Sequence, residues 1–354
     1  MFVHGIRITD GAERQLTQGG RIPLSVHDYT TTGGVTLILD NSVYINAPFD
    51  DSFCQEPEAT LFFDSSNGYF VSFRGKEIPA RILALPGYLH ATDSQGRPVT
   101  YTVFSHADRV RVSPIYGCTM SCKFCDIPGN KYVRRPLEQL LEGLNIAMTD
   151  STLPVYHILI TGGSPSPRDF EYFDRVCAGI IGSVHLPVDL MMPPRPKDFG
   201  FVDRLADMGI RGFSINLEVF GEEASKKITP EKHRIGLGAF AKTIERAVQR
   251  TGGADRVRSL VVVGLESEEK TLDAVHFLAR LGCDPVLSPF RPTRGTALSG
   301  YPVPSYEFLE RVYLESVDIV ERYGVKLGPR CIPCQHNTLT FPDNSGAYYF
   351  SAEK

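Results

Sequence analysis

Three cysteines stand close together in the middle of the chain. Cys118, Cys122 and Cys125 lie in the run Cys-Thr-Met-Ser-Cys-Lys-Phe-Cys, with three and then two residues between them. Three thiolates on one short loop can bind three irons of a [4Fe–4S] cube and leave the fourth iron without a protein ligand. Such an open iron can chelate the amino and carboxylate groups of a small molecule. The spacing therefore predicts an iron–sulfur centre with one vacant coordination position.

A structural zinc site is the main alternative use of these cysteines. Zinc normally takes four ligands, commonly from paired Cys-x-x-Cys knuckles, and this triplet supplies an uneven three. In that case the chain would be a zinc-binding interaction protein without catalysis. Colour separates the two hypotheses, because an iron–sulfur protein is brown and a zinc protein is colourless.

A second cysteine pair lies near the end of the chain. Cys331 and Cys334 belong to a segment rich in turn-forming residues. A Cys-x-x-Cys pair in a chain that already binds iron suggests an auxiliary iron–sulfur cluster or another metal site. Two ligands are too few, and Cys54 could be the third if the two ends of the chain meet over the site. A redox or structural pair, or two inert cysteines, are the alternatives.

Composition places the chain among ordinary globular proteins. It has 354 residues, 42% of them hydrophobic and 22% charged, with a formal net charge of −4. This balance gives no basic footprint for nucleic acid or for an anionic membrane surface. No apolar run approaches the roughly 20 residues that span a bilayer, and the first ten residues lack a secretory pattern. We therefore expect a cytoplasmic protein with neither a nucleic-acid nor a membrane partner.

The pattern of apolar residues divides the chain into three parts. Residues 1–105 contain short alternating apolar runs broken by Gly, Asp and Asn, which predict a β-rich N-terminal module. Its expected strands are 35–39, 43–47, 60–63, 69–73 and 78–83. Residues 301–354 carry a helix at 306–323 and then the Cys-x-x-Cys extension.

In the central part, residues 106–300, short apolar runs alternate with amphipathic helical stretches. Strands are expected at 111–114, 157–160, 188–191, 212–217, 257–263 and 285–287, and helices at 137–148, 170–181, 199–208, 237–250 and 270–281. This alternation predicts an α/β fold, a partial (β/α)6 TIM-like barrel. Parallel barrels place their chemistry at the C-terminal ends of the strands, and the cysteine triplet directly follows the first strand.

The cysteine spacing, with the aromatic Phe124 before the last cysteine, resembles the defining motif of the radical S-adenosylmethionine superfamily. The resemblance covers residues 111–298, and its later part is most similar to the biotin synthase branch. It implies a [4Fe–4S] cluster that reductively cleaves S-adenosylmethionine to a 5′-deoxyadenosyl radical. That radical would abstract hydrogen from a small-molecule or carrier-bound substrate. The resemblance also implies an external one-electron reductant of the flavodoxin or ferredoxin kind.

The resemblance gives cofactor-binding roles to residues after the second strand and after the fifth. Gly162, Gly163 and Ser164 match the turn whose backbone receives the methionine amino group, with serine where relatives carry an acid. Gly264 and Leu265 match the segment that packs against adenine. Glycines allow the close backbone approach that such a turn requires.

Polar residues at the fourth strand complete the expected cofactor site. Ser214, Asn216 and Glu218 alternate and therefore share one face, where relatives hold the ribose and carboxylate of the cofactor. Arg234 resembles the basic residue that pairs with that carboxylate. After the sixth strand, Arg291 and Arg294 could bind an anionic group of the substrate. These two arginines are the substrate contacts that we expect.

Sulfur insertion is the reaction that the two cysteine groups favour together. A substrate radical would capture sulfide from an auxiliary cluster at Cys54, Cys331 and Cys334, as in biotin and lipoyl synthesis. Dehydrogenation, epimerisation, decarboxylation or rearrangement without sulfur transfer is the enzymatic alternative. The expected barrel strands carry no cysteines for the second cluster, which departs from biotin synthase.

Overall fold

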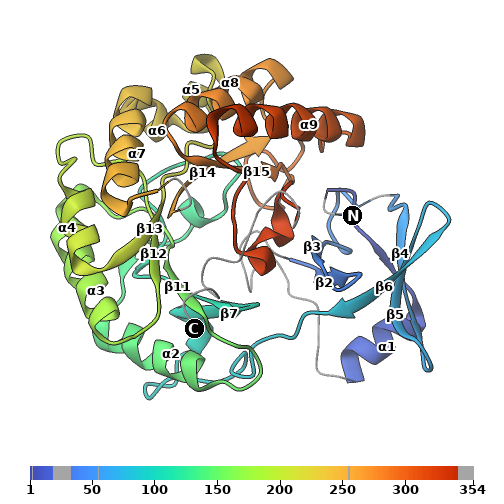
Figure 1. The fold of residues 1–354 in the computed structure, drawn as a ribbon. Coiled ribbons are helices and arrows are strands. Elements are labelled where there is room, and N and C mark those ends of the chain that lie inside the picture. Colours follow the sequence, from blue (N-terminus) through green and yellow to red (C-terminus); the bar gives the residue numbers. More distant parts are fainter. Residues whose placement is uncertain (2, 19–32, 55, 254–255, 342–354) are drawn as a thin grey trace.

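The computed structural model describes residues 1, 3–18, 33–54, 56–253 and 256–341. Within these ranges, a six-stranded N-terminal sheet lies beside a seven-stranded barrel sheet (Figure 1). The N-terminal module and the C-terminal extension expected from the sequence both include residues outside the described ranges, at 19–32 and 342–354. No helix in the described ranges is long and apolar enough to cross a membrane.

The N-terminal sheet has the strand order β1-β4-β5-β6-β2-β3. Its elements are β1 (Arg7–Ile8), α1 (Asp10–Gln18), β2 (Val35–Leu39), β3 (Val43–Ala47), β4 (Ala59–Asp64), β5 (Gly68–Phe73) and β6 (Lys76–Ile82). Helix α1 packs Ala12 and Leu16 against Leu37, Leu61 and Val71 of the sheet, and all five are buried. Helix α1, which was not expected from the sequence, thereby covers one apolar face of the predicted strands.

The barrel sheet has the order β15-β14-β13-β12-β11-β8-β7. Six strands are parallel: β8 (Arg109–Val112), β11 (His157–Ile160), β12 (Val188–Met191), β13 (Ile210–Ser214), β14 (Val257–Val263) and β15 (Asp284–Pro289). The outer helices are α2 (Leu137–Thr149), α3 (Phe170–Gly182), α4 (Phe201–Met208), α5 (Glu222–Ile228), α6 (Pro230–Ile235), α7 (Leu237–Thr251), α8 (Glu268–Arg280) and α9 (Tyr306–Tyr323). Figure 1 shows these helices on the outside of the curled sheet. The partial (β/α)6 TIM-like barrel is confirmed.

Strand β7 (Val103–His106) extends the barrel sheet beyond the six expected strands, pairing antiparallel with β8. The barrel sheet thus begins at Val103, whereas the N-terminal sheet ends with β6 at Ile82. The sequence boundary at residue 105 falls inside β7. An edge strand of four residues carries too short a pattern to be recognised from the sequence alone.

Side chains of the barrel strands alternate between the helices and the lumen. In β8, Val110 and Val112 are fully buried in the core between sheet and helices, whereas Arg109 and Arg111 line the interior cavity. The same alternation brings Ser214, Asn216 and Glu218 to the lumen. In β8, the apolar residues therefore face the helices and the polar residues face the lumen.

Residues 328–340, called the strap below, follow α9 and include the 3-10 helix η5 (Ile332–Asn337). Backbone amides of Gly328 and Leu339 donate to Pro285 and Leu287 of β15, each at 2.8 Å. At the other edge of the barrel sheet, the ring of His336 lies 3.9 Å from that of His106 in β7. Figure 1 shows η5 between the barrel and the N-terminal sheet. The strap therefore covers the open side of the barrel.

Candidate functional site

A cavity of about 330 Å³ inside the barrel is lined both by the cysteine triplet and by residues of the strap. It collects side chains from the loops after four strands, as expected for a parallel barrel. The predicted site residues that line it are Cys118, Cys122, Phe124, Cys125, Gly162, Ser164, Ser214, Asn216, Glu218 and Cys334.

The three cysteines are free thiols and partly buried. The Cys118 sulfur accepts hydrogen bonds from the backbone amides of Ser164 at 3.2 Å and Met120 at 3.4 Å. Burial raises the pKa of the Cys125 thiol to about 12, and it also raises the pKa of the Cys122 thiol. Three unpaired thiols that line one cavity are a donor set that fits three irons of a cube, since metal binding displaces their protons.

Contacts from two sides fix the backbone of the cysteine loop. The carboxylate of Glu231, in α6, accepts hydrogen bonds from the Ser121 amide at 2.8 Å and from the Ser121 hydroxyl. On the other side, the Thr119 hydroxyl donates to the carbonyl oxygen of Ser164 at 3.0 Å. The loop is therefore held between α6 and the turn after β11. Glu231 went unrecognised in the sequence, because a glutamate in a helix gives no sign of a distant amide partner.

The turn after β11 brings Gly162 to the cavity but not Gly163. Gly162 has a φ of +133° and lines the cavity. A Cβ atom on Gly163 would lie 1.5 Å from the carbonyl oxygen of Gly117, so no side chain fits there. Gly163 is thus required by the close approach of the cysteine loop, a reason that differs from the expected cofactor contact.

Polar groups at the end of β13 form a connected set. The Ser214 hydroxyl donates to the amide oxygen of Asn216 at 2.8 Å, and the Leu260 amide donates to the same oxygen at 3.3 Å. Lys232 of α6 donates to the Asn216 carbonyl at 2.6 Å and lies 2.8 Å from the Glu218 carboxylate. Lys232 was missed in the sequence, although it stands two residues before Arg234.

Besides Gly163, three expected cofactor contacts lie outside the cavity lining. The Arg234 side chain is 70% exposed and pairs with Glu231 at 2.9 Å, so the inward-facing base of α6 is Lys232. Leu265 packs in an apolar cluster that includes Phe124, and Gly264 lies against Pro304. Leu265 and Gly264 therefore pack behind the cavity, and none of the three residues is among those that line it.

Cys54 does not join Cys331 and Cys334. It lies in the N-terminal module, where its amide donates to the Asp51 carbonyl and its sulfur would stand 2.5 Å from a Cβ atom on Gly5. Burial raises the pKa of the Cys54 thiol to about 11. Cys54, the possible third ligand of an auxiliary cluster, is therefore not in the group that surrounds Cys331 and Cys334. Two other residues lie beside that pair.

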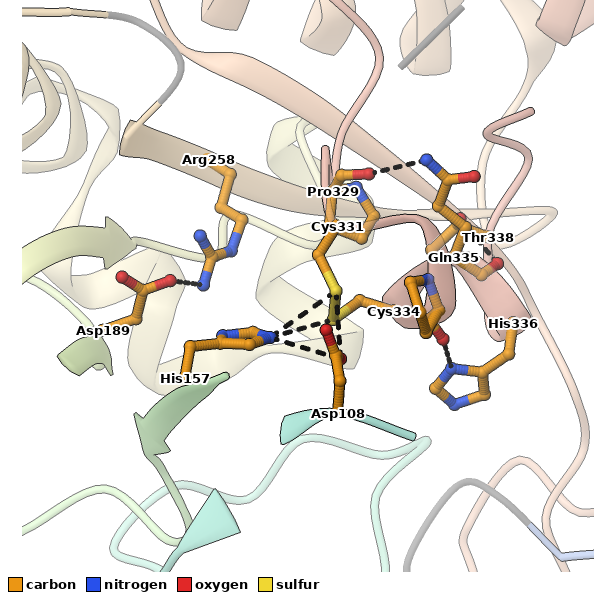
Figure 2. The surroundings of a disulfide bond; sticks show 11 residues. Asp108, His157, Asp189, Arg258, Pro329, Cys331, Cys334, Gln335, His336 and Thr338 are labelled. Atoms are coloured by element: carbon orange, nitrogen blue, oxygen red, sulfur yellow. Dashed lines mark hydrogen bonds and ion pairs between the residues drawn. A yellow bond between two sulfur atoms is a disulfide. The ribbon is translucent and has the colours of Figure 1, made fainter. Parts of the chain in front are cut away.

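Those neighbours are Asp108 and His157, at the amino ends of β8 and β11 (Figure 2). His157 Nε2 lies 3.5 Å from the Cys331 sulfur and 3.6 Å from the Cys334 sulfur, and the two sulfurs are joined as a disulfide. All four residues are buried. His157 was read only as the start of a strand, because the sequence does not reveal its partner in the strap.

The described residues that line the cavity carry an excess of positive charge. Its basic side chains are Arg109, Arg111, Lys232, Arg258 and Arg291, and its acidic one is Glu218. Arg258 pairs with Asp189 at 2.7 Å, and Arg291 donates to the Asn46 amide oxygen at 2.7 Å. Arg291 thus reaches the cavity as expected, whereas Arg294 does not line it. The alternation Arg-Val-Arg-Val in β8 is the sequence feature from which the lumen positions of Arg109 and Arg111 could have been predicted.

Comparison with known proteins identifies the central part of the chain. The model of the Radical SAM superfamily matches residues 112–279. The GTP 3′,8-cyclase of Aquifex aeolicus (strain VF5) is 25% identical over 197 residues, which are 54% of this chain and 56% of that protein. The match thus spans little more than half the length of this relative.

Two solved structures share the fold at low sequence identity. The FeFe-hydrogenase maturase HydG from Carboxydothermus hydrogenoformans has a TM-score of 0.51 and 15% identity, covering 64% of this chain and 56% of its own. A radical SAM methyltransferase from Sphaerobacter thermophilus has a TM-score of 0.51 and 16% identity, covering 77% and 76%. The likeness to the biotin synthase branch stays a prediction. Residues 112–279 of this chain are a radical SAM domain.

Proposed function

We propose that Cys118, Cys122 and Cys125 hold a [4Fe–4S] cluster with which this chain cleaves S-adenosylmethionine and removes hydrogen from an anionic small molecule. The radical SAM domain implies the cluster and S-adenosylmethionine. When bound, they supply an electron and a 5′-deoxyadenosyl radical. The observation that supports the proposal most is the single cavity shared by the three free thiols, the polar groups of β13 and four arginines.

The polar groups beside the cysteine loop are suited to hold the cofactor. Asn216 is fixed by two hydrogen bonds to its amide oxygen, and Glu218 is fixed by Lys232. Because these side chains are already ordered, binding a ribose or an amino acid moiety costs little further side-chain conformational entropy. The Gly162 backbone can approach the methionine part closely because it carries no side chain.

The positive charge of the side chains that line the cavity supports an anionic substrate. Arg109 and Arg258 lie near the amino ends of β8 and β14, whereas the cysteine loop follows the carboxyl end of the first parallel strand. A carboxylate or phosphate on these arginines would direct the rest of the substrate toward the cofactor. Residues of the strap line the same cavity, and covering a site in this way helps to protect a reactive radical from water.

Sulfur insertion is the reaction that an auxiliary cluster at Cys331 and Cys334 would support, with Cys54 as its possible third ligand. Since Cys54 lies apart from Cys331 and Cys334, we favour radical chemistry without sulfur transfer: dehydrogenation, epimerisation, decarboxylation or rearrangement. The substrate is a small molecule or a carrier-bound group that reaches this cavity. We further propose a flavodoxin- or ferredoxin-like reductant and a cytoplasmic location, where free thiols persist.

Anaerobic reconstitution tests this proposal. The protein should be brown, contain about four irons per chain at the triplet, and release methionine and 5′-deoxyadenosine in equal amounts under reduction. Cys118→Ala should abolish both products. Among deuterated carboxylates and phosphate esters, a substrate should raise 5′-deoxyadenosine formation and transfer deuterium into it, and Arg258→Met should lose this increase but keep the uncoupled cleavage. A colourless protein that binds only zinc would contradict the proposal.

A further inference from the structure

Four buried side chains converge where the strap crosses the amino ends of β8 and β11 (Figure 2). They are Asp108, His157, Cys331 and Cys334, and their ligand atoms all lie within 4.8 Å of one another. Each of the four is of a type that binds transition metals. They come from three parts of the chain far apart in sequence, so local backbone geometry alone does not bring them together.

Four of the six distances between these atoms match the edges of a tetrahedron around one ion, and the two sulfurs, which are joined as a disulfide, would have to separate on reduction to complete it. His157 Nε2 lies 3.5 Å and 3.6 Å from the two sulfurs and 3.6 Å from Asp108 Oδ1. Asp108 Oδ1 lies 3.6 Å from the Cys331 sulfur. Metal–ligand distances of about 2.0–2.3 Å separate tetrahedral ligands by about 3.3–3.8 Å. A multi-iron cluster spreads its ligands farther, because they bind different irons.

A disulfide alone gives an incomplete account of this group. The bond joins Cys331 to Cys334, yet a carboxylate and an imidazole still point at the two sulfurs (Figure 2). Asp108 is buried, and its Oδ2 makes no hydrogen bond within the described part of the chain. A buried carboxylate beside neutral sulfurs is costly. A divalent cation between two thiolates and this carboxylate would remove most of that cost.

We infer that, when Cys331 and Cys334 are reduced, they bind one zinc ion together with Asp108 and His157. The two thiols release their protons as the metal binds. Four protein ligands leave no open position, so the ion is structural. It ties the strap to β8 and β11 and closes the floor of the cavity. This inference does not rest on the proposed radical reaction, since a chain that never cleaves S-adenosylmethionine would still bind the ion.

Metal analysis of the full chain tests the site. A variant with alanine at Cys118, Cys122 and Cys125 removes the competing thiols, and it should retain about one zinc per chain after anaerobic purification with a thiol reductant. Cobalt(II) exchanged into this variant should give the visible bands of a tetrahedral thiolate complex. Adding His157→Ala or Cys334→Ser should abolish both signals. The matched control Cys54→Ser, which changes a thiol outside the group, should keep them.

Zinc-edge X-ray absorption on the wild-type protein with its cluster in place serves if the triple variant does not fold. The spectrum should show two sulfur and two nitrogen or oxygen neighbours. Absence of stoichiometric zinc overturns the inference. So does a Cys331–Cys334 disulfide that persists in the reduced protein, or extra iron with acid-labile sulfide at this pair.

Discussion

Lys232 and Glu218 form a largely buried ion pair at the edge of the cavity, with Nζ 2.8 Å from Oε2. The same ammonium group donates to the Asn216 carbonyl at 2.6 Å. Its neighbour Glu231 binds the backbone of the cysteine loop. Helix α6 therefore connects the polar end of β13 with the loop that carries the three thiols.

Replacing Lys232 by methionine should lower the free energy of unfolding by about 3–5 kcal/mol, because Glu218 would keep a buried charge without a partner. Urea denaturation under anaerobic conditions measures this loss. Arg234→Met is the matched control, since that side chain is 70% exposed, and it should leave stability nearly unchanged. Equal losses in the two variants would contradict the assignment of Lys232 as the inward-facing base.

Gly163→Ala should prevent assembly of the iron site while leaving the fold intact. A Cβ at this position would overlap the Gly117 carbonyl, so the cysteine loop must move. Iron per chain after reconstitution should fall several-fold from about four. Gly238→Ala in α7, where a Cβ meets nothing within 4 Å, should bind iron normally. Circular dichroism of both variants checks that the helices are retained.

Glu231→Ala should loosen the cysteine loop by removing the acceptor for the Ser121 amide and hydroxyl. Hydrogen bonds to a charged group contribute about 1.5–3 kcal/mol, so loss of iron to a chelator should become at least tenfold faster. Glu231→Gln keeps one acceptor oxygen and should be intermediate. The exposed Glu245→Ala provides the control, and a chelation rate in Glu231→Ala equal to that control would rule out the clamp.

Arg330→Met should release the strap from the barrel. The Arg330 guanidinium donates to both carboxylate oxygens of Asp284, at 2.6 Å and 3.1 Å, and Asp284 is buried. Loss of this partner should cost about 3–5 kcal/mol locally and speed amide exchange of the strap in hydrogen-exchange mass spectrometry. Arg322→Met, an exposed residue at the end of α9, should leave the exchange of the strap unchanged.

The sequence predicted those parts of the molecule that depend on local pattern. Period-two and helical patterns located the parallel strands and six of the outer helices, but not the short helices α5 and α6. The spacing of Cys118, Cys122 and Cys125 located the cysteine loop. Alternation along β13 placed Ser214, Asn216 and Glu218 in the lumen, where they lie. Local sequence determines which face of a strand a residue occupies.

The sequence could not reveal contacts that depend on how distant segments meet. Cys54 was considered as a possible third ligand beside Cys331 and Cys334, whereas the fold brings Cys331 to His157 and Asp108. Arg234 was chosen over Lys232 by resemblance, although the rotation of α6 decides which of the two faces inward. The strap was expected only as a turn-rich Cys-x-x-Cys extension, because its path across the barrel depends on distant contacts. β7 was missed because four residues carry too short a pattern.

The strap also affects the order in which the molecule is completed during translation. The cysteine loop and all six parallel strands are synthesised before residue 328, so the barrel with its proposed iron-binding loop can form while the lumen is still open to solvent. Only later does the ribosome supply the residues that cover the opening between β15 and β7. Iron could therefore reach the cysteine loop before the strap covers the lumen. A chain truncated before the strap would leave any radical formed in the lumen exposed to water and oxygen.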